Sequence, residues 1–161
     1  MKVVILCGGM GTRLREETEF RPKPMVKIGT KPILWHIMKH YAHYGFNQFV
    51  LCLGYKGEAI KEYFYHYMLH NNDVTVKLGK DRQIMIHENS QVEDWEITLV
   101  DTGEQTLKGA RIHKIKNYID GDFMVTYGDG ISDIDIGSLV RFHEEHGKIA
   151  TVTGVNPRSS Y

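Results

Sequence analysis

The chain has 161 residues, of which 42% are hydrophobic and 25% are charged, and its formal net charge is zero. This length is enough for one hydrophobic core and short for two, so we expect a single domain over residues 1–161. The balanced charge argues against general nucleic-acid binding, and no segment approaches the length of a membrane span. Residues 1–40 nevertheless hold eight Lys and Arg against three Asp and Glu, so cations are in excess at this end of the chain.

The first predicted element is a strand followed by a glycine-rich turn. The apolar run at residues 3–7 is typical of a strand that is covered on both faces, as in a parallel sheet. The turn that follows reads Gly8-Gly9-Met10-Gly11-Thr12-Arg13. Its glycines allow positive φ angles and let backbone N–H groups approach a ligand closely. Successive N–H groups in such a turn form a concave anion site, which the start of a helix nearby would strengthen.

Two cations accompany this turn. Arg13 offers a planar fork that matches phosphate oxygens, whereas Lys23 is a movable point charge between two prolines. The alternative interpretation is a tight strand-to-loop turn with solvated cations. The combination of strand, glycines and cations favours a nucleoside triphosphate site.

The cysteines indicate a reducing compartment. Cys7 and Cys52 both lie in apolar, strand-like runs and have no disulfide or metal spacing, so we expect buried, reduced thiols. No signal peptide is visible, and we therefore expect a cytoplasmic protein. The nine histidines are scattered, which favours packing or surface roles over metal binding.

Helix and strand patterns alternate along the next part of the chain. Apolar spacing between Ile33 and Tyr41, with Pro32 before it and Gly45 after it, predicts a helix of about three turns. Residues 48–53 predict a second strand. Apolar spacing over residues 59–68 predicts another helix, whose aromatic stripe we assign to the core.

The pattern changes after residue 73. Short alternating runs at residues 74–78, 84–87 and 97–100 predict an antiparallel excursion or edge strands. The later expected elements are a helix at about 108–118, a strand at 123–125, a helix at about 136–145 ended by Gly147, and a last strand at 150–155. This alternation implies right-handed crossovers and an α/β fold, with a Rossmann-like layered mixed sheet flanked by helices.

Asp129 is the candidate metal ligand. It lies in Gly128-Asp129-Gly130, which follows the strand predicted at 123–125 after Thr126 and Tyr127. Ligands of doubly wound sheets bind beyond the carboxyl ends of strands, and flanking glycines let Asp129 point into that crevice. A carboxylate beside phosphates suits Mg²⁺. The alternative is a turn aspartate bonded to its own backbone.

Motifs through almost the whole chain, as far as Val155, resemble those of sugar-1-phosphate nucleotidyltransferases. Three segments narrow the resemblance to the glucose-1-phosphate cytidylyltransferase branch. They are Lys23-Pro24-Met25-Val26, Gly29-Thr30-Lys31-Pro32-Ile33-Leu34-Trp35-His36-Ile37-Met38 and Gly54-Tyr55-Lys56-Gly57. The resemblance implies a fold of the nucleotide-diphospho-sugar transferase type. It also implies that relatives continue past the end of this chain into a sugar-binding part with a second metal-binding aspartate. We therefore expect a chain that is incomplete at its C-terminus, and a naturally short protein is the alternative.

The activity implied by the resemblance is nucleotidyl transfer from CTP to glucose 1-phosphate, giving CDP-glucose and pyrophosphate. This reaction would serve nucleotide-sugar and surface polysaccharide biosynthesis, including the lipopolysaccharide O-antigen. The alternatives are a UTP- or dTTP-dependent sugar-1-phosphate nucleotidyltransferase and a non-catalytic nucleotide-binding module. An NAD-dependent oxidoreductase fits less well, because Gly9-x-Gly11 continues without the third glycine of the dinucleotide fingerprint.

The expected partners and cofactor follow from this reaction. They are CTP, glucose 1-phosphate, pyrophosphate and Mg²⁺. With a single carboxylate for Mg²⁺, we expect this exact polypeptide to be a poor catalyst. Exposed sheet edges and apolar surface predict a homo-oligomer.

Nucleotidyl transfer depends mainly on positioning and charge neutralisation, so it needs no protein nucleophile. We assign Arg13 to the leaving pyrophosphate or transition-state charge, Lys23 to the α-phosphate and Asp129 to the metal; these three are the predicted catalytic residues. Thr12 is assigned a hydroxyl contact.

A second cluster follows the strand predicted at 97–100. The resemblance makes Glu104, Gly109 and Arg111 candidates for base or ribose contacts, and a purely structural loop is the alternative. Backbone groups of residues 6–9 are candidates for reading the amino and carbonyl groups of cytosine. The full predicted nucleotide-binding set is Leu6, Cys7, Gly8, Gly9, Met10, Gly11, Thr12, Arg13, Lys23, Glu104, Gly109, Arg111 and Gly128.

Overall fold

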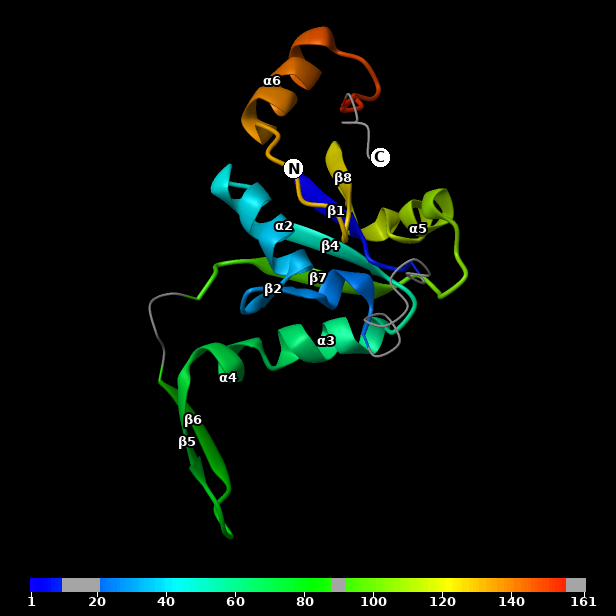
Figure 1. Cartoon of the computed structure of the whole chain (residues 1–161). Coiled ribbons are helices and arrows are strands. Elements are labelled where there is room, and N and C mark those ends of the chain that lie inside the picture. Colours follow the sequence, from blue (N-terminus) through cyan, green and yellow to red (C-terminus); the bar gives the residue numbers. More distant parts are fainter. Residues whose placement is uncertain (10–20, 88–91, 156–161) are drawn as a thin grey trace, which may run out of the picture. The chain divides into compact units, whose positions relative to one another are not determined.

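The structure is a computed structural model that describes residues 1–9, 21–87 and 92–155. It contains two compact units, Met1–Ile131 and Ser132–Tyr161, and the single domain expected over 1–161 stays a prediction. The elements of the first unit are β1 (Lys2–Leu6), η1 (Lys23–Met25), β2 (Lys27–Ile28), β3 (Lys31–Pro32), α2 (Ile33–His43), β4 (Gln48–Leu53), α3 (Gly57–Tyr65), α4 (Tyr67–Asn71), β5 (Asp73–Lys77), β6 (Gln83–His87), β7 (Glu96–Asp101), α5 (Lys108–Lys114), η2 (Lys116–Tyr118) and β8 (Phe123–Tyr127) (Figure 1). The second unit contains α6 (Ile136–His146).

A four-stranded parallel sheet in the order β7-β4-β1-β8 forms the centre of the first unit. In its register, Val4 lies between Val50 of β4 and Val125 of β8. The predicted layered α/β sheet is thus confirmed. Among the described residues, antiparallel pairing occurs only in two separate two-stranded sheets, β2–β3 and β5–β6, so the mixed pairing expected within the central sheet is not observed there.

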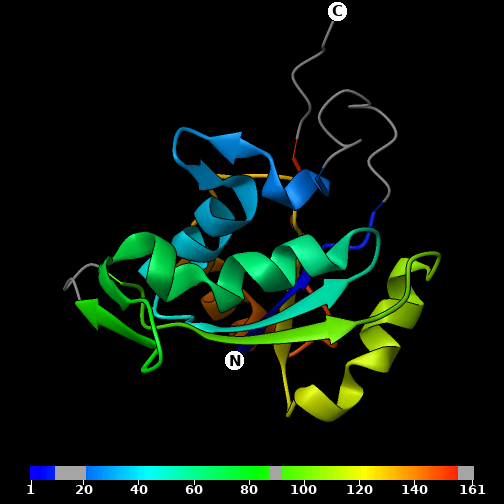
Figure 2. The same ribbon diagram turned by 90° about the horizontal axis from the view of Figure 1, so that it is seen from below.

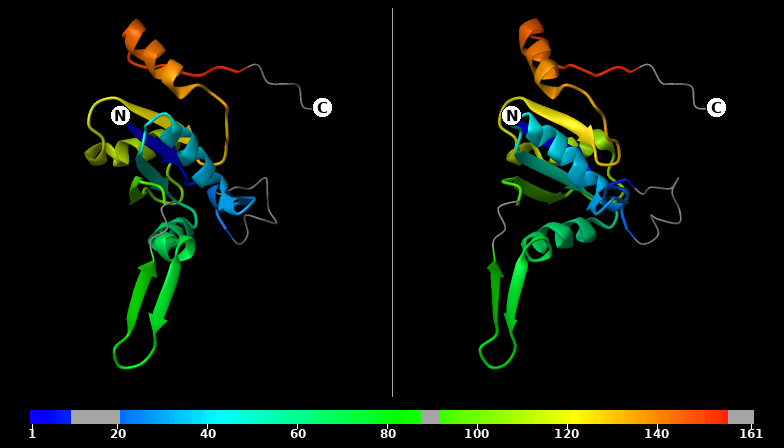
Figure 3. Two further views of the ribbon diagram at one scale, coloured as in Figure 1. Left: turned by 90° about the vertical axis from the view of Figure 1, so that its left-hand side faces the viewer. Right: turned by 60° about the vertical axis from the view of Figure 1, so that its left-hand side comes forward.

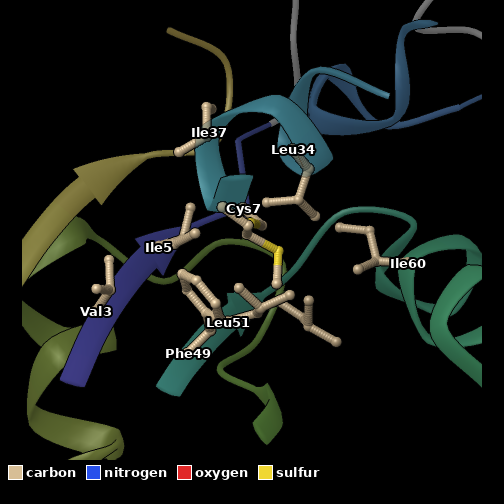
Figure 4. Close-up of a cluster of buried hydrophobic side chains, with 10 residues drawn as sticks. Val3, Ile5, Cys7, Leu34, Ile37, Phe49, Leu51 and Ile60 are labelled. Carbon is tan, nitrogen blue, oxygen red and sulfur yellow. The ribbon is translucent and has the colours of Figure 1, made fainter. Parts of the chain in front are cut away.

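Helices cover both faces of this sheet (Figure 2). On one face, β1 and β4 pack against α2 and α3 (Figure 4). The buried residues of this cluster are Val3, Ile5, Cys7, Leu34, Ile37, Met38, Phe49, Leu51, Leu53 and Ile60. On the other face, Val4, Val50 and Cys52 pack with Ile115, which follows α5. Burial on both faces explains why β1 is continuously apolar.

The expectation of buried, reduced thiols is confirmed. Cys7 and Cys52 are 1% and 0% exposed, and neither forms a disulfide. Burial raises the pKa of the Cys52 thiol to about 11, and burial likewise raises the pKa of Cys7 above its usual range. Because thiolates are the reactive form, both cysteines act as small apolar core residues.

The expected elements are confirmed with a few corrections. The helix predicted over 59–68 is interrupted at His66, which separates α3 from α4, and the helix predicted to reach 118 ends at Lys114 before the 3-10 turn η2. The run at 97–100 lies in β7, which is an edge strand as expected but pairs parallel to β4. No described helix is both long and apolar enough to cross a membrane.

The strand predicted at 150–155 is wrong, because residues 150–155 have no strand conformation. Val152 and Val155 are 88% and 77% exposed, and the described part of the second unit contains no strand with which they might pair. A strand requires such a partner for its backbone N–H and C=O groups. The start of α6 is as expected, since Asp135 caps it by accepting a hydrogen bond from Ser138 N at 2.8 Å.

The hairpin β5–β6 is the antiparallel excursion that the alternating runs predicted, and it extends from the end of α4 (Figure 3). Val74 pairs with Ile86 and Val76 with Ile84, so these four side chains share one face of the hairpin. They are 40%, 38%, 52% and 57% exposed, in that order. This apolar face of the hairpin is exposed to solvent, whereas helices cover the faces of the central sheet.

Candidate functional site

The carboxyl ends of all four central strands meet at one edge of the sheet. The parallel hydrogen bonding continues one residue past three of these strands: Cys7 N donates to Cys52 O at 3.0 Å, Thr102 N to Leu53 O at 3.0 Å and Gly128 N to Leu6 O at 3.1 Å. The loops that leave β1, β7 and β8 therefore start in fixed positions beside one another, as expected for the ligand-binding edge of such a sheet.

A pocket of about 460 Å³ lies at this edge. The segments that line it are the end of β1, η1, the loop before α5 with part of α5, and the end of β8. Its described lining residues are Leu6, Cys7, Gly8, Gly9, Lys23, Pro24, Glu104, Gln105, Thr106, Leu107, Lys108, Arg111, Tyr127 and Asp129. Segments that are far apart in the sequence are thus brought together as the motifs predicted.

Lys23 and Asp129 form an ion pair in the lining of this pocket. Lys23 Nζ lies 3.5 Å from Asp129 Oδ2, and the two side chains are 22% and 44% exposed. Gly128 makes this approach possible, because a Cβ on Gly128 would lie 2.9 Å from Cys7 Sγ and 3.0 Å from Pro24 Cγ. The site therefore contains a partly buried ion pair whose charges remain accessible from the pocket.

Arg111 forms the floor of the same site and is only 5% exposed. Its Nη1 donates to Leu53 O at 2.9 Å and to Thr102 Oγ1 at 2.7 Å. Its Nη2 donates to Gly8 O and Glu104 O, both at 3.0 Å. The guanidinium thus joins the loop after β1 to the ends of β4 and β7.

One glycine of the first turn, Gly8, leaves room for Arg111. Neither Gly8 nor Gly9 has a positive φ, so the expected conformational reason for these two glycines is wrong. A Cβ on Gly8 would instead overlap the Arg111 guanidinium, and a Cβ on Gly54 would lie 2.7 Å from Arg111 Nη1. Gly8 and Gly54 leave the space that the buried guanidinium occupies.

The other predicted residues have varied positions. Glu104 lines the pocket and accepts a bond from Arg111 through its backbone, whereas Gly109 is exposed in α5 and is not among the lining residues. Met10, Gly11, Thr12 and Arg13 lie outside the described residues.

Sequence reasoning missed Tyr127 and Lys108, which also line the pocket. Lys108 Nζ lies 5.1 Å from the centre of the Tyr127 ring, within the range of a cation–π contact. The position of Tyr127 directly before Gly128 at a strand end was the signal that might have identified it.

The residues present fit a divalent cation only in combination with a phosphorylated ligand. Asp129 is the acidic side chain at the end of β8, and the described residues contain no group of three or more His, Cys, Asp or Glu that could hold a metal. Mg²⁺ is commonly held by one or two carboxylates together with substrate phosphates and water. The Asp129 carboxylate in this pocket is compatible with that mode.

Fold and site together define an α/β protein with a nucleotide-binding type of crevice at the carboxyl edge of its sheet. The family model for nucleotidyl transferases matches residues 2–161, and the chain belongs to that family. It is 52% identical over 159 residues to glucose-1-phosphate cytidylyltransferase of Salmonella typhimurium, a match that covers 98% of this chain and 61% of the relative. It is 49% identical over 162 residues to a probable glucose-1-phosphate cytidylyltransferase of Bacillus subtilis, covering 100% of this chain and 63% of the relative.

Comparison of structures agrees with this assignment. The crystal structure of HddC from Yersinia pseudotuberculosis complexed with GMP-PN superposes with a TM-score of 0.63 at 26% sequence identity, covering 88% of this chain and 53% of that chain. The chain spans only about three fifths of the length of each of these two cytidylyltransferases, 61% and 63% respectively.

The packing of Arg111 against Gly8 predicts unequal effects of alanine at the two adjacent glycines. Gly8→Ala should lower the free energy of unfolding by about 1–3 kcal/mol, because the new methyl group must displace a guanidinium held by four hydrogen bonds. Gly9→Ala is the matched control: apart from its chain neighbours, no atom of the described residues lies within 4 Å of its Cβ position, and a change within about 0.5 kcal/mol is expected. Urea unfolding measures both, and equal midpoints for the two variants would contradict the packing argument.

Proposed function

We propose that this protein transfers the cytidylyl group of CTP to glucose 1-phosphate, forming CDP-glucose and releasing pyrophosphate, for nucleotide-sugar and surface polysaccharide biosynthesis. The observation that carries the proposal is the meeting of Gly8, Lys23 and Asp129 in one pocket at the carboxyl edge of the sheet. Backbone donors and a cation can bind a polyphosphate, and a carboxylate can hold the Mg²⁺ that accompanies it. The identities of 52% and 49% to cytidylyltransferases support the choice of CTP and glucose 1-phosphate.

The reaction requires little covalent chemistry from the protein. A phosphate oxygen of glucose 1-phosphate bonds to the α-phosphorus of CTP, and the bond from that phosphorus to the oxygen that bridges to the β-phosphate breaks. The electron pair of the broken bond leaves with pyrophosphate. Positioning of the two anions and stabilisation of this charge account for catalysis.

Lys23 has a mobile role in this scheme. In the free protein its ammonium is partly neutralised by Asp129 at 3.5 Å. When CTP binds, we expect Lys23 to contact the α-phosphate, while Asp129 is the residue that would hold Mg²⁺. The ion, when bound, supplies positive charge to the phosphates. Arg13 and Thr12 keep the roles assigned from the sequence, toward the leaving pyrophosphate and as a hydroxyl contact.

Base recognition is assigned to the backbone of residues 6–9, which line the pocket. Glu104 and Gly109 remain candidates for contacts with the nucleoside, and Glu104 is the one of these two that lines the pocket.

We also expect a cytoplasmic homo-oligomer. The reduced, buried thiols of Cys7 and Cys52 support the compartment, and cell fractionation tests it. The exposed apolar face of the β5–β6 hairpin supports self-association. A single monomeric species in sedimentation velocity at micromolar concentration would argue against it.

Ligand ranking tests the function. Thermal unfolding is measured with CTP, UTP, dTTP and NAD, each with and without Mg²⁺, and CTP with Mg²⁺ should raise the midpoint most because only ligands of the folded state stabilise it. Release of pyrophosphate on addition of glucose 1-phosphate then distinguishes an enzyme from a non-catalytic nucleotide-binding module. A larger shift with UTP or dTTP would contradict the cytidylyl assignment.

Substitutions in the ion pair should separate metal binding from phosphate binding. Asp129→Asn should weaken the dependence of CTP binding on Mg²⁺, because the amide lacks the charge that attracts the cation. Lys23→Ala should lower turnover by at least about 100-fold, in the range of lost electrostatic stabilisation of a transition state, without changing the fold. Magnesium titrations and initial rates measure the two effects, and circular dichroism checks folding. If Asp129→Asn leaves the magnesium titration unchanged, Asp129 has only a role in the turn.

A further inference from the structure

Arg111 carries a buried charge that lacks a carboxylate partner among the described residues. Its four hydrogen bonds go to three backbone carbonyls and one hydroxyl, and none of the ion pairs in the described part of the chain includes it. An arginine stays protonated even when buried, so the positive charge is permanent. Burial of a charge without a counter-ion costs free energy that a bound anion can offset.

The geometry also limits what Arg111 can offer to a ligand directly. A guanidinium has four terminal N–H groups and one on Nε. Each terminal nitrogen of Arg111 already makes two hydrogen bonds to the protein. The two-pronged fork that would recognise a base or a ribose is therefore occupied.

The bond to Gly8 has a consequence for the neighbouring peptide N–H. The Gly8 carbonyl and the Gly9 N–H belong to one peptide unit, which is trans, so they point in opposite directions. Because the carbonyl points to Arg111 Nη2, the Gly9 N–H points away from the buried guanidinium. Gly9 itself is exposed and lines the pocket.

We propose that Arg111 is a positioning residue for the phosphate tail of the nucleotide: it fixes the Gly8–Gly9 peptide so that the Gly9 N–H is a donor to phosphate, and it places a permanent positive charge beneath the turn. The inference rests on the proposed function and deepens it. It moves Arg111 from the expected base or ribose contact to the polyphosphate end of the ligand. Because it also gives the Gly9 N–H to phosphate, it leaves the backbone of residues 6–8 for base recognition. Gly8 and Gly54 are part of the same arrangement, because only residues without Cβ leave room for the guanidinium.

The test compares three probes that share parts of CTP: CTP itself, inorganic tripolyphosphate and cytidine. Isothermal titration is performed on the wild type, Arg111→Met and Arg111→Lys. Arg111→Met should weaken CTP and tripolyphosphate roughly 10- to 100-fold, the range for a lost charged hydrogen-bonding group, and change cytidine less than about threefold. Arg111→Lys keeps a charge but cannot reach all four acceptors at once, so it should weaken tripolyphosphate by about tenfold.

Lys114→Met is the matched control. Lys114 lies on the same helix, but it donates to Thr102 O at 2.8 Å and Thr106 Oγ1 at 3.2 Å and not to Gly8. Its loss removes a cation from the same neighbourhood and should leave tripolyphosphate affinity within about threefold. If Arg111→Met fails to fold by circular dichroism, Arg111→Lys and the control carry the test.

The Gly9 amide gives a readout that a merely structural role would not move. In ¹⁵N–¹H spectra, tripolyphosphate should shift the Gly9 resonance in the wild type and leave it nearly unshifted in Arg111→Lys. Equal losses of cytidine and CTP affinity would overturn the inference in favour of a base contact, and unchanged tripolyphosphate affinity in both Arg111 variants would also overturn it. A wild type that binds tripolyphosphate and prefers UTP contradicts the cytidylyl assignment alone and leaves the Arg111 comparison valid.

Discussion

Three donors converge on the carbonyl oxygen of Leu53 at the carboxyl end of β4: the backbone N–H of Thr102 at 3.0 Å, the Thr102 hydroxyl at 2.6 Å and Arg111 Nη1 at 2.9 Å. Through its other terminal nitrogen, Nη2, Arg111 donates a hydrogen bond to Gly8 O in the loop after β1. The loops after β1 and β7 are therefore fixed to β4 by one side chain from α5. The need for glycine at positions 8 and 54 depends on this junction.

The elements that were predicted well are those whose pattern is complete within a few residues. Residues 48–53 form β4 with the predicted bounds, and β1 and α2 follow their apolar spacing closely. The pairing of strands was harder to predict from the sequence. A run of alternating residues shows which side chains favour burial, but it does not show which strand lies beside them. The partner of β7 is β4, where Glu96 pairs with Gln48, and no local signal indicates a parallel neighbour so distant in sequence. The apolar run at 150–155 failed as a strand for the same reason.

The residues of the site likewise differ in how well the sequence predicts them. Gly8, Lys23 and Asp129 were identified because each is in a short motif that reports its own chemistry, and the structure brings them to one pocket. Arg111 lacks such a motif. Its acceptors Leu53 and Gly8 are 58 and 103 positions away in the chain, so its buried position follows from the packing of α5 and not from its neighbours in sequence. Long-range contacts of this kind also explain why the reason for Gly8 was misjudged: the requirement is space for a distant side chain.

The cations of the site differ in freedom, and the difference suits a reaction in which charge moves. Lys23 is partly exposed, has a compact ammonium on a flexible stem and lies 3.5 Å from Asp129, a partner that the proposed mechanism replaces with a phosphate. Arg111 is buried and held by four bonds, so its field changes little as ligands arrive. Preorganised charge stabilises a developing anion without a reorganisation cost at the moment of bond breaking, whereas a mobile charge can follow the phosphorus that is transferred. In the proposed reaction, the fixed charge of Arg111 thus serves binding of the polyphosphate, and the mobile charge of Lys23 serves the transfer step.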